Sequence, residues 1–282
     1  MTESPPPSRR GFLWLTLRWG VFAVLLYLGI VVAFSSFETS LVFRPASASE
    51  SWIDPVDPQT RDVWFESGGN RLHGWWLPPA PANDSAVLVA HGNGGNVSHR
   101  GQVAASLRRI LGCGVLLFEY PGYGKSTGSP DEAGCYAAGE TAYRWLTEEA
   151  NIPAPRIILW GESLGGGVAV DLATRLDHRA LVLMFTFTSL PAAAKHHYPW
   201  LPTHTLMRTR FNNLAKISRC HRPVLLMHGT ADAIIPLSHS EKLFAAANEP
   251  KELLRLEGFG HNSVVPDSVY KTLGRFLEIH AP

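Results

Sequence analysis

Short apolar runs alternate with amphipathic stretches along most of the chain. The apolar runs are Val87–Ala90, Val115–Phe118, Ile157–Trp160, Leu181–Phe185 and Val224–Met227. Runs of this length predict parallel strands buried on both faces of a sheet. The stretches between them predict helices, and they include Val103–Leu111, Ala133–Glu148 and Leu164–Arg175. The alternation therefore predicts an α/β fold, with a mostly parallel, doubly wound sheet and helices on both faces.

One longer apolar stretch stands apart near the beginning of the chain. Trp19–Phe37 contains no charged residue, and its nineteen residues span about 28 Å as a helix, close to the hydrocarbon thickness of a bilayer. Arginines precede it, so the positive-inside bias predicts a cytoplasmic amino terminus and an extracytoplasmic body. A cleaved secretory signal ending at Ala33-Phe34-Ser35 is the main alternative, and a buried soluble helix is the weaker one.

Composition and charge narrow the function mainly by exclusion. The 282 residues carry 25 Lys and Arg against 24 Asp and Glu, a formal net charge of +1. Without a basic block, nucleic acid is not an expected partner. Three cysteines without metal-type spacing predict neither a disulfide framework nor a zinc site. Neighbouring histidines, His196, His197 and His204, lack a carboxylate or thiolate to complete a metal site. We expect no metal and no cofactor.

A candidate nucleophile follows the third of these apolar runs. Gly161-Glu162-Ser163-Leu164-Gly165 matches the pattern G-x-S-x-G, and it joins a predicted strand to a predicted helix. A serine on such a sharp turn is held in a strained conformation, with its hydroxyl exposed at the carboxyl edge of the sheet. The alternative is a serine that only caps the helix. The context favours Ser163 as a nucleophile.

A serine hydroxyl needs a base, and the base needs an orienting acid. Asp232 follows the predicted strand Val224–Met227, and His261 follows the strand-like Glu252–Leu256. The order Ser, Asp, His is the one expected for this arrangement. We therefore predict the triad Ser163, His261 and Asp232.

The oxyanion formed in acyl transfer requires backbone donors. One predicted donor is the N–H of Leu164, directly after the nucleophile. The other is the backbone N–H of Asn93, in the glycine-rich loop His91-Gly92-Asn93-Gly94-Gly95-Asn96. A plain glycine turn is the alternative for that loop.

Five motifs together resemble a known family. They are His91-Gly92-Asn93-Gly94-Gly95-Asn96, Tyr120-Pro121-Gly122-Tyr123-Gly124-Lys125-Ser126, Gly161-Glu162-Ser163-Leu164-Gly165-Gly166, His228-Gly229-Thr230-Ala231-Asp232 and Gly260-His261-Asn262. In this order they resemble the BEM46-like branch of the α/β-hydrolase superfamily, near the serine aminopeptidase (S33-type) domain. The resemblance implies the same triad and oxyanion hole, and it implies an amino-terminal membrane segment. One departure is Glu119-Tyr120-Pro121, where relatives commonly have Asp-Tyr-Arg; it lies outside the predicted triad, and we interpret it as minor.

The resemblance leaves the substrate open among esters, thioesters, lipids and peptides. Between Phe185 and Val224, a short cap carries apolar side chains: Tyr198, Trp200, Leu201, Leu206, Met207 and Phe211. They either line an acyl pocket or pack beneath helices. The leading hypothesis is a serine esterase or acyl hydrolase that takes a small-molecule or lipid-like acyl substrate. Alternatives are an S33-type peptidase and a non-catalytic, membrane-tethered binding module.

The predicted domain organisation has four parts. Residues 1–18 form a cytoplasmic segment, 19–37 a transmembrane helix, 38–60 a linker, and 61–282 the α/β-hydrolase domain, which opens with a hairpin formed by Asp62–Phe65 and Leu72–Leu77. We expect a chain that starts near Ser47 to be soluble and to hydrolyse esters. The sequence gives no indication of the oligomeric state.

Overall fold

An eight-stranded sheet forms the centre of the molecule in the computed structural model, which describes residues 9–81 and 83–282. The strand order is β10-β9-β8-β7-β4-β6-β3-β2. The bounds are β2 Arg61–Ser67, β3 Asn70–Leu77, β4 Ala86–Ala90, β6 Gly114–Phe118, β7 Ile157–Glu162, β8 Ala180–Met184, β9 Val224–Gly229 and β10 Lys251–Leu256. All pairs from β6 to β10 are parallel, whereas the hairpin β2–β3 runs antiparallel. The predicted α/β-hydrolase fold is confirmed.

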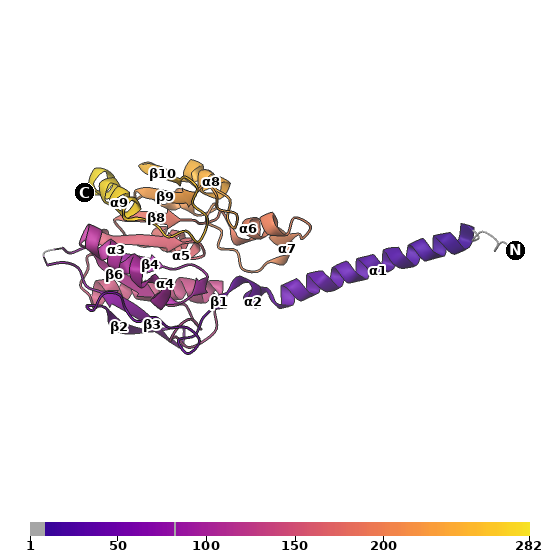
Figure 1. Ribbon diagram of the computed structural model, residues 1–282, viewed down its shortest axis with the longest axis horizontal. Helices are drawn as coiled ribbons and strands as arrows, with labels where there is room; N and C mark the ends of the chain where they lie inside the picture. The colour runs from indigo at the N-terminus through magenta and orange to yellow at the C-terminus, as the bar shows by residue number, and fades with distance from the viewer. Residues whose placement is uncertain (1–8, 82) are drawn as a thin grey trace.

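Helices cover both faces of this sheet (Figure 1). Residues of α3 and α9 pack with one face, and residues of α4, α5 and α8 pack with the other. The bounds are α3 Gly101–Leu111, α4 Glu132–Glu148, α5 Gly165–Ala173, α8 Ser238–Ala246 and α9 Asp267–His280. Every residue of β4, β6 and β8 is buried, which explains why these strands appear in the sequence as uninterrupted apolar runs. Short 3-10 turns connect some elements, and they are η1 Val97–Arg100, η2 Ala154–Arg156 and η3 Ile217–Arg219.

The cap between β8 and β9 contains two short helices, α6 Leu190–His197 and α7 Thr203–Leu206. Strand β8 ends at Met184, because Phe185 adopts a φ of 51° and turns the chain toward the cap. Helices α6 and α7 lie on the side of the domain from which the amino-terminal helix projects (Figure 1).

The amino-terminal helix α1, Arg9–Ser36, extends away from the domain. Its segment Leu13–Ser36 is long and apolar enough to cross a membrane by length and composition. This segment begins before the predicted Trp19 because the helix continues through Arg18, and a single arginine can reach the headgroups with its long side chain. Residues 1–8 of the predicted cytoplasmic segment lie outside the described residues.

The predicted linker, residues 38–60, begins with ordered structure. Helix α2, Glu38–Val42, is followed by strand β1, Arg44–Pro45, which pairs in parallel with β5, Gly94–Gly95. Phe43 is buried and contacts Phe211 with its ring edge-on. This part of the segment is packed into the domain, so a chain starting near Ser47 lacks contacts that the folded domain makes.

Candidate active site

Ser163 lies on the turn between β7 and α5, where sequence predicts a nucleophile. Its φ of 52° is in the left-handed region, which is costly for a residue with a side chain. The turn is held by two hydrogen bonds, from Ser163 N to Met184 O at 2.9 Å and from Thr186 Oγ1 to Ser163 O at 2.7 Å. Gly165 packs so closely on the end of β4 that a Cβ there would collide with Ala90 O. The strained serine is therefore fixed by its surroundings.

The structure brings the three predicted side chains together. His261 Nε2 lies 3.0 Å from Ser163 Oγ, and His261 Nδ1 lies 2.7 Å from Asp232 Oδ2. The imidazole therefore bridges the hydroxyl and the carboxylate. With Nδ1 donating to Asp232, Nε2 is left to accept the serine proton.

Two adjoining loops position Asp232 and His261. Ala231 N donates to Phe259 O at 3.0 Å, and Gly258 N donates to Thr230 Oγ1 at 2.9 Å. The loops approach so closely that a Cβ on Gly229 would collide with Phe259 O. The two segments that carry Asp232 and His261 are therefore held together by direct contacts.

The carboxylate of Asp232 is fully hydrogen-bonded. Its Oδ1 accepts from the N–H of Ile234 at 2.9 Å and of Ile235 at 2.8 Å, and its Oδ2 lies 3.3 Å from His228 Nε2. Burial would raise the pKa of Asp232, but the hydrogen bonds from His228, His261 and Ile235 outweigh it and hold this pKa well below its usual range. Asp232 is therefore ionised at neutral pH.

Asn93 and Leu164, the predicted oxyanion-hole residues, line the same pocket as Ser163. The side-chain oxygen of Asn93 accepts the N–H of Arg44 at 3.0 Å and faces Tyr123 Oη at 3.2 Å. Tyr123 Oη also donates to Asn93 O at 2.9 Å. These bonds occupy the side chain and the carbonyl of Asn93 and do not involve its backbone N–H, the predicted oxyanion donor.

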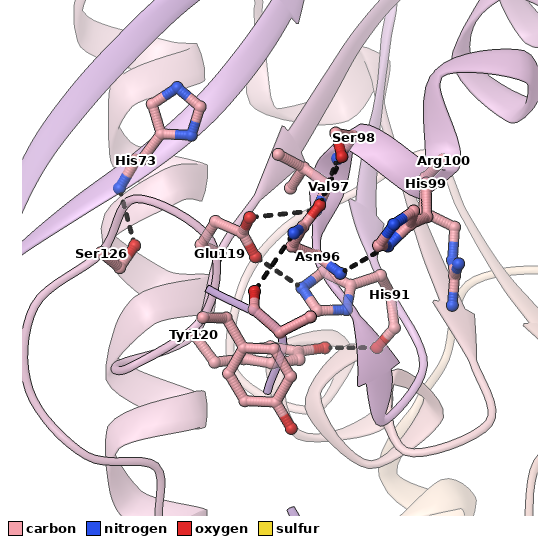
Figure 2. A network of polar contacts seen from close by, with 12 residues as sticks. His73, His91, Asn96, Val97, Ser98, His99, Arg100, Glu119, Tyr120 and Ser126 are labelled. Carbon is pink, nitrogen blue, oxygen red and sulfur yellow. Dashed lines mark hydrogen bonds and ion pairs between the residues drawn. The ribbon is translucent and has the colours of Figure 1, made fainter. Parts of the chain in front are cut away.

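A buried polar network braces the loop that carries Asn93, and Figure 2 shows it. Glu119 Oε1 accepts the N–H of Val97 at 3.0 Å, and Glu119 Oε2 lies 3.2 Å from His91 Nε2. Tyr120 Oη donates to His91 O at 2.7 Å. His91 and Glu119 are both fully buried. Glu119, part of the departure that we interpreted as minor, therefore stabilises this loop. In the sequence it is recognisable only as a carboxylate directly after a predicted buried strand.

A cavity of about 320 Å³ opens beside Ser163. The cap contributes Tyr198, Leu201, Leu206 and Met207 to its lining, as predicted. The other two predicted side chains have different surroundings: Trp200 is half exposed, and Phe211 is buried against Gly167. The opposite wall was not predicted from the sequence. It comes from the end of α1 and from α2, with Phe34, Ser35, Glu38, Leu41 and Val42.

Metal-binding clusters are not found among residues 9–81 and 83–282, since no group of three His, Cys, Asp or Glu side chains there could hold an ion. His197, one of the three cap histidines, has its Nε2 2.8 Å from Ile234 O. Cys113, Cys135 and Cys220 are buried free thiols.

Comparisons with known proteins agree with this architecture. The sequence profile of the family described as alpha/beta hydrolase fold matches residues 85–203. The chain is 40% identical over 236 residues to the protein Rv2307c of Mycobacterium tuberculosis, covering 83% of this chain and 84% of that protein. It is 33% identical over 212 residues to human alpha/beta hydrolase domain-containing protein 17B, covering 75% of this chain and 70% of that protein. The esterase Pf2001 of Pyrococcus furiosus has the same fold, with a TM-score of 0.69 and 19% identity over 85% of this chain and 100% of that chain.

Proposed function

The chain belongs to the α/β-hydrolase superfamily, and on this premise we propose that it is a serine hydrolase that cleaves ester-type acyl bonds through an acyl-enzyme. The observation that carries the proposal is the hydrogen-bonded series from Ser163 Oγ through His261 to Asp232, at 3.0 and 2.7 Å. Ser163 is the nucleophile, His261 the general base and acid, and Asp232 the group that orients the imidazole.

In the first half of the reaction, Ser163 Oγ attacks the carbonyl carbon of the ester while its proton moves to His261 Nε2. The carbonyl oxygen becomes an oxyanion that accepts hydrogen bonds from the N–H groups of Asn93 and Leu164. When the intermediate collapses, the bond to the alcohol oxygen breaks and His261 Nε2 returns the proton to the leaving alcohol. The acyl group remains bonded to Ser163.

The second half repeats these steps with water. His261 Nε2 takes a proton from a water molecule, whose oxygen attacks the acyl carbon. Collapse of the second oxyanion breaks the bond to Ser163 Oγ, which recovers its proton from His261. Asp232 stays ionised throughout, because its pKa lies well below the usual carboxyl range, and it stabilises the imidazolium formed in each half.

The lining of the cavity supports a proposal for the substrate class. Its lining beside Ser163 is mostly apolar, and its apolar members include Phe187, Leu190, Ala193 and Ile235. Such a cavity accommodates an acyl chain more readily than a charged group. An apolar acyl ester is therefore the proposed substrate.

The proposed topology is a single-pass membrane protein with residues 19–37 within the bilayer and the domain 61–282 extracytoplasmic. The apolar side chains along α1, such as Leu17, Phe22 and Leu25, are more than half exposed, and lipid is the environment that suits them. A fusion after Pro282 to a reporter active only outside the cytoplasm tests the orientation.

The function is tested with purified full-length protein in detergent or nanodiscs. A panel of p-nitrophenyl esters, an acyl-thioester and an anilide of the same acyl group separates esterase, thioesterase and peptidase activity. We expect hydrolysis of the esters with covalent labelling of Ser163 by a fluorophosphonate. Absence of labelling together with absence of turnover on the whole panel would reject the proposal in favour of a non-catalytic protein.

A further inference from the structure

The end of the amino-terminal helix forms part of the cavity beside Ser163. Phe34 and Ser35 of α1 line this cavity together with Leu41 and Val42 of α2. The opposite wall comes from the cap, with Ala194 and Leu201 among its members. The cavity thus lies between the helix that can span a membrane and the cap, and not within the domain alone.

Aromatic contacts join the cap to α1. The ring of Phe34 meets Tyr198 at 5.3 Å and Trp200 at 6.1 Å, both in edge-to-face geometry. Tyr27 Oη donates to Trp200 O at 3.3 Å, and the two rings are 6.4 Å apart. The tip of the cap therefore lies along the side of α1.

The level of these contacts along α1 places the cap tip relative to a bilayer. Tyr27 precedes Ser35 by eight positions, which is about 12 Å along a helix axis. Leu13–Ser36 is the segment suited to span the membrane, and Tyr27 lies well inside it, so a residue beside Tyr27 lies within the depth of the bilayer. Trp200 and Tyr198 are 50% and 39% exposed, and lipid is an environment that suits exposed aromatic rings at this depth. The cap tip is therefore at bilayer level.

The rim of the cavity on this side is also apolar. Leu41 and Ile234 line the cavity, yet they are 43% and 45% exposed, and the neighbouring Phe37 is 63% exposed. Exposed apolar side chains gathered at one opening indicate contact with something other than water. The spanning helix directly beside them identifies lipid as that environment.

From this arrangement we infer that the cavity opens into the bilayer and receives the acyl chain of a membrane-resident ester by lateral entry. The inference rests on the proposed serine hydrolase function and names its substrate class. An ester carbonyl near the headgroups reaches Ser163 while its acyl chain passes from the leaflet into the cavity. In this role α1 forms a wall of the binding site in addition to anchoring the chain.

The test uses full-length protein in phosphatidylcholine nanodiscs and two esters with the same leaving group. 4-Methylumbelliferyl palmitate partitions into the bilayer, and 4-methylumbelliferyl acetate reports the chemistry at Ser163 from water. Ser35→Trp fills the cavity from α1, whereas Ser36→Trp adds the same side chain at the next, exposed position, which does not line the cavity. We expect Ser35→Trp to lower the ratio of palmitate to acetate hydrolysis about tenfold, and Ser36→Trp to leave it unchanged.

A second pair of variants keeps the test valid if one of the first pair fails to fold. Leu41→Trp obstructs the rim of the cavity from α2, whereas Ser40→Trp adds the same side chain at an exposed neighbouring position that does not line the cavity. We expect Leu41→Trp, but not Ser40→Trp, to lower the ratio of palmitate to acetate hydrolysis. In addition, adding lipid at constant total palmitate ester should slow its hydrolysis in the wild type, because lateral entry depends on the ester's mole fraction in the bilayer.

The outcomes separate the inference from the function on which it rests. Two results would overturn lateral entry alone, provided that the acetate ester is still hydrolysed. One is the same ratio of palmitate to acetate hydrolysis in each tryptophan variant and its matched control. The other is a rate of palmitate hydrolysis that does not change when lipid is added. If neither ester is cleaved and Ser163 is not labelled by a fluorophosphonate, the serine hydrolase function fails, and lateral entry fails with it.

Discussion

The backbone N–H of Arg44 donates to Asn93 Oδ1 at 3.0 Å, and this bond joins the segment that follows the amino-terminal helix to the loop expected to bind the oxyanion. In the same region, β1 pairs with β5, two residues at the centre of that loop. The position of Asn93 therefore depends on residues that precede the predicted domain. These contacts connect the segment after α1 with the pocket that contains Ser163.

Replacement of the nucleophile should separate chemistry from stability. Ser163→Ala should abolish fluorophosphonate labelling, because the probe reacts with an activated hydroxyl, whereas Ser268→Ala at an exposed position should label fully. Ser163→Gly should also be unlabelled, but its free energy of unfolding should exceed that of Ser163→Ala by about 1 kcal/mol, because glycine adopts a φ of 52° without strain. Thermal unfolding of both variants measures the difference. Labelling of the alanine variant at another serine would show that Ser163 is not the nucleophile.

Loss of the carboxylate should reduce turnover without removing the fold. Asp232→Asn is expected to lower kcat about 10³- to 10⁴-fold, because the imidazole loses the acceptor that fixes its tautomer. Glu257 provides the matched control: it is the carboxylate nearest to His261 in sequence, and its Oε2 lies 3.2 Å from Thr230 Oγ1. Glu257→Gln should therefore retain most activity in steady-state assays. The opposite ranking of the two variants would assign the acid to Glu257.

Local sequence pattern predicted the sheet and the proximity of Ser163, Asp232 and His261, because both depend on short stretches of sequence. Buried parallel strands require continuous apolar runs, and the residues at their carboxyl ends gather at one edge. The contacts of Glu38 were not predictable in this way, because its partners Arg208 and Thr209 are 170 and 171 positions away. The residues around Pro45–Pro58 have the polar, proline-rich composition of a linker, so the sequence did not indicate that helix α2 and the pairing of β1 with β5 precede them.

Buried histidines should make stability depend on pH. His239 is 7% exposed, and its Nδ1 accepts the N–H of Thr188 at 3.2 Å. Burial, helped by the charge of Lys242, lowers its pKa to about 4. The unfolded chain takes up this proton near pH 6.5, so the contribution of His239 is complete above that pH and declines as the pH falls toward 4.

The expected loss is on the order of 2 kcal/mol for His239 between pH 6.5 and 4. Burial lowers the pKa of His73 and His178 as well, so their contributions change in the same direction. Denaturant unfolding across this pH range measures the slope. His239→Asn, which keeps an acceptor for Thr188, should be less stable at pH 8 but should show a smaller slope. An unchanged slope in this variant would assign the pH dependence to other groups.

Truncation tests whether the domain includes the segment after α1. The Glu38 carboxylate accepts the N–H of Arg208 at 3.0 Å and of Thr209 at 2.7 Å, and Phe43 is buried. A chain that starts at Phe37 keeps these contacts, whereas one that starts at Ser47 loses them together with the bond from Arg44 to Asn93. Burying one phenylalanine and satisfying two amides with a carboxylate contributes on the order of 3–5 kcal/mol. We therefore expect the shorter chain to unfold at a lower temperature and to hydrolyse 4-methylumbelliferyl acetate more slowly.

Glu38→Gln in the chain starting at Phe37 isolates the carboxylate from the rest of the segment. Its amide keeps one acceptor oxygen for two backbone donors, so the loss should be intermediate, while Glu66→Gln at an exposed strand position should have no effect. Thermal unfolding and acetate hydrolysis are measured on all four chains. Equal stability and equal activity of the chains starting at Phe37 and Ser47 would show that the domain begins where the sequence pattern predicted. A graded loss from Phe37 through Glu38→Gln to Ser47 would show that the residues between the anchor and the sheet hold the cap and the oxyanion loop in place.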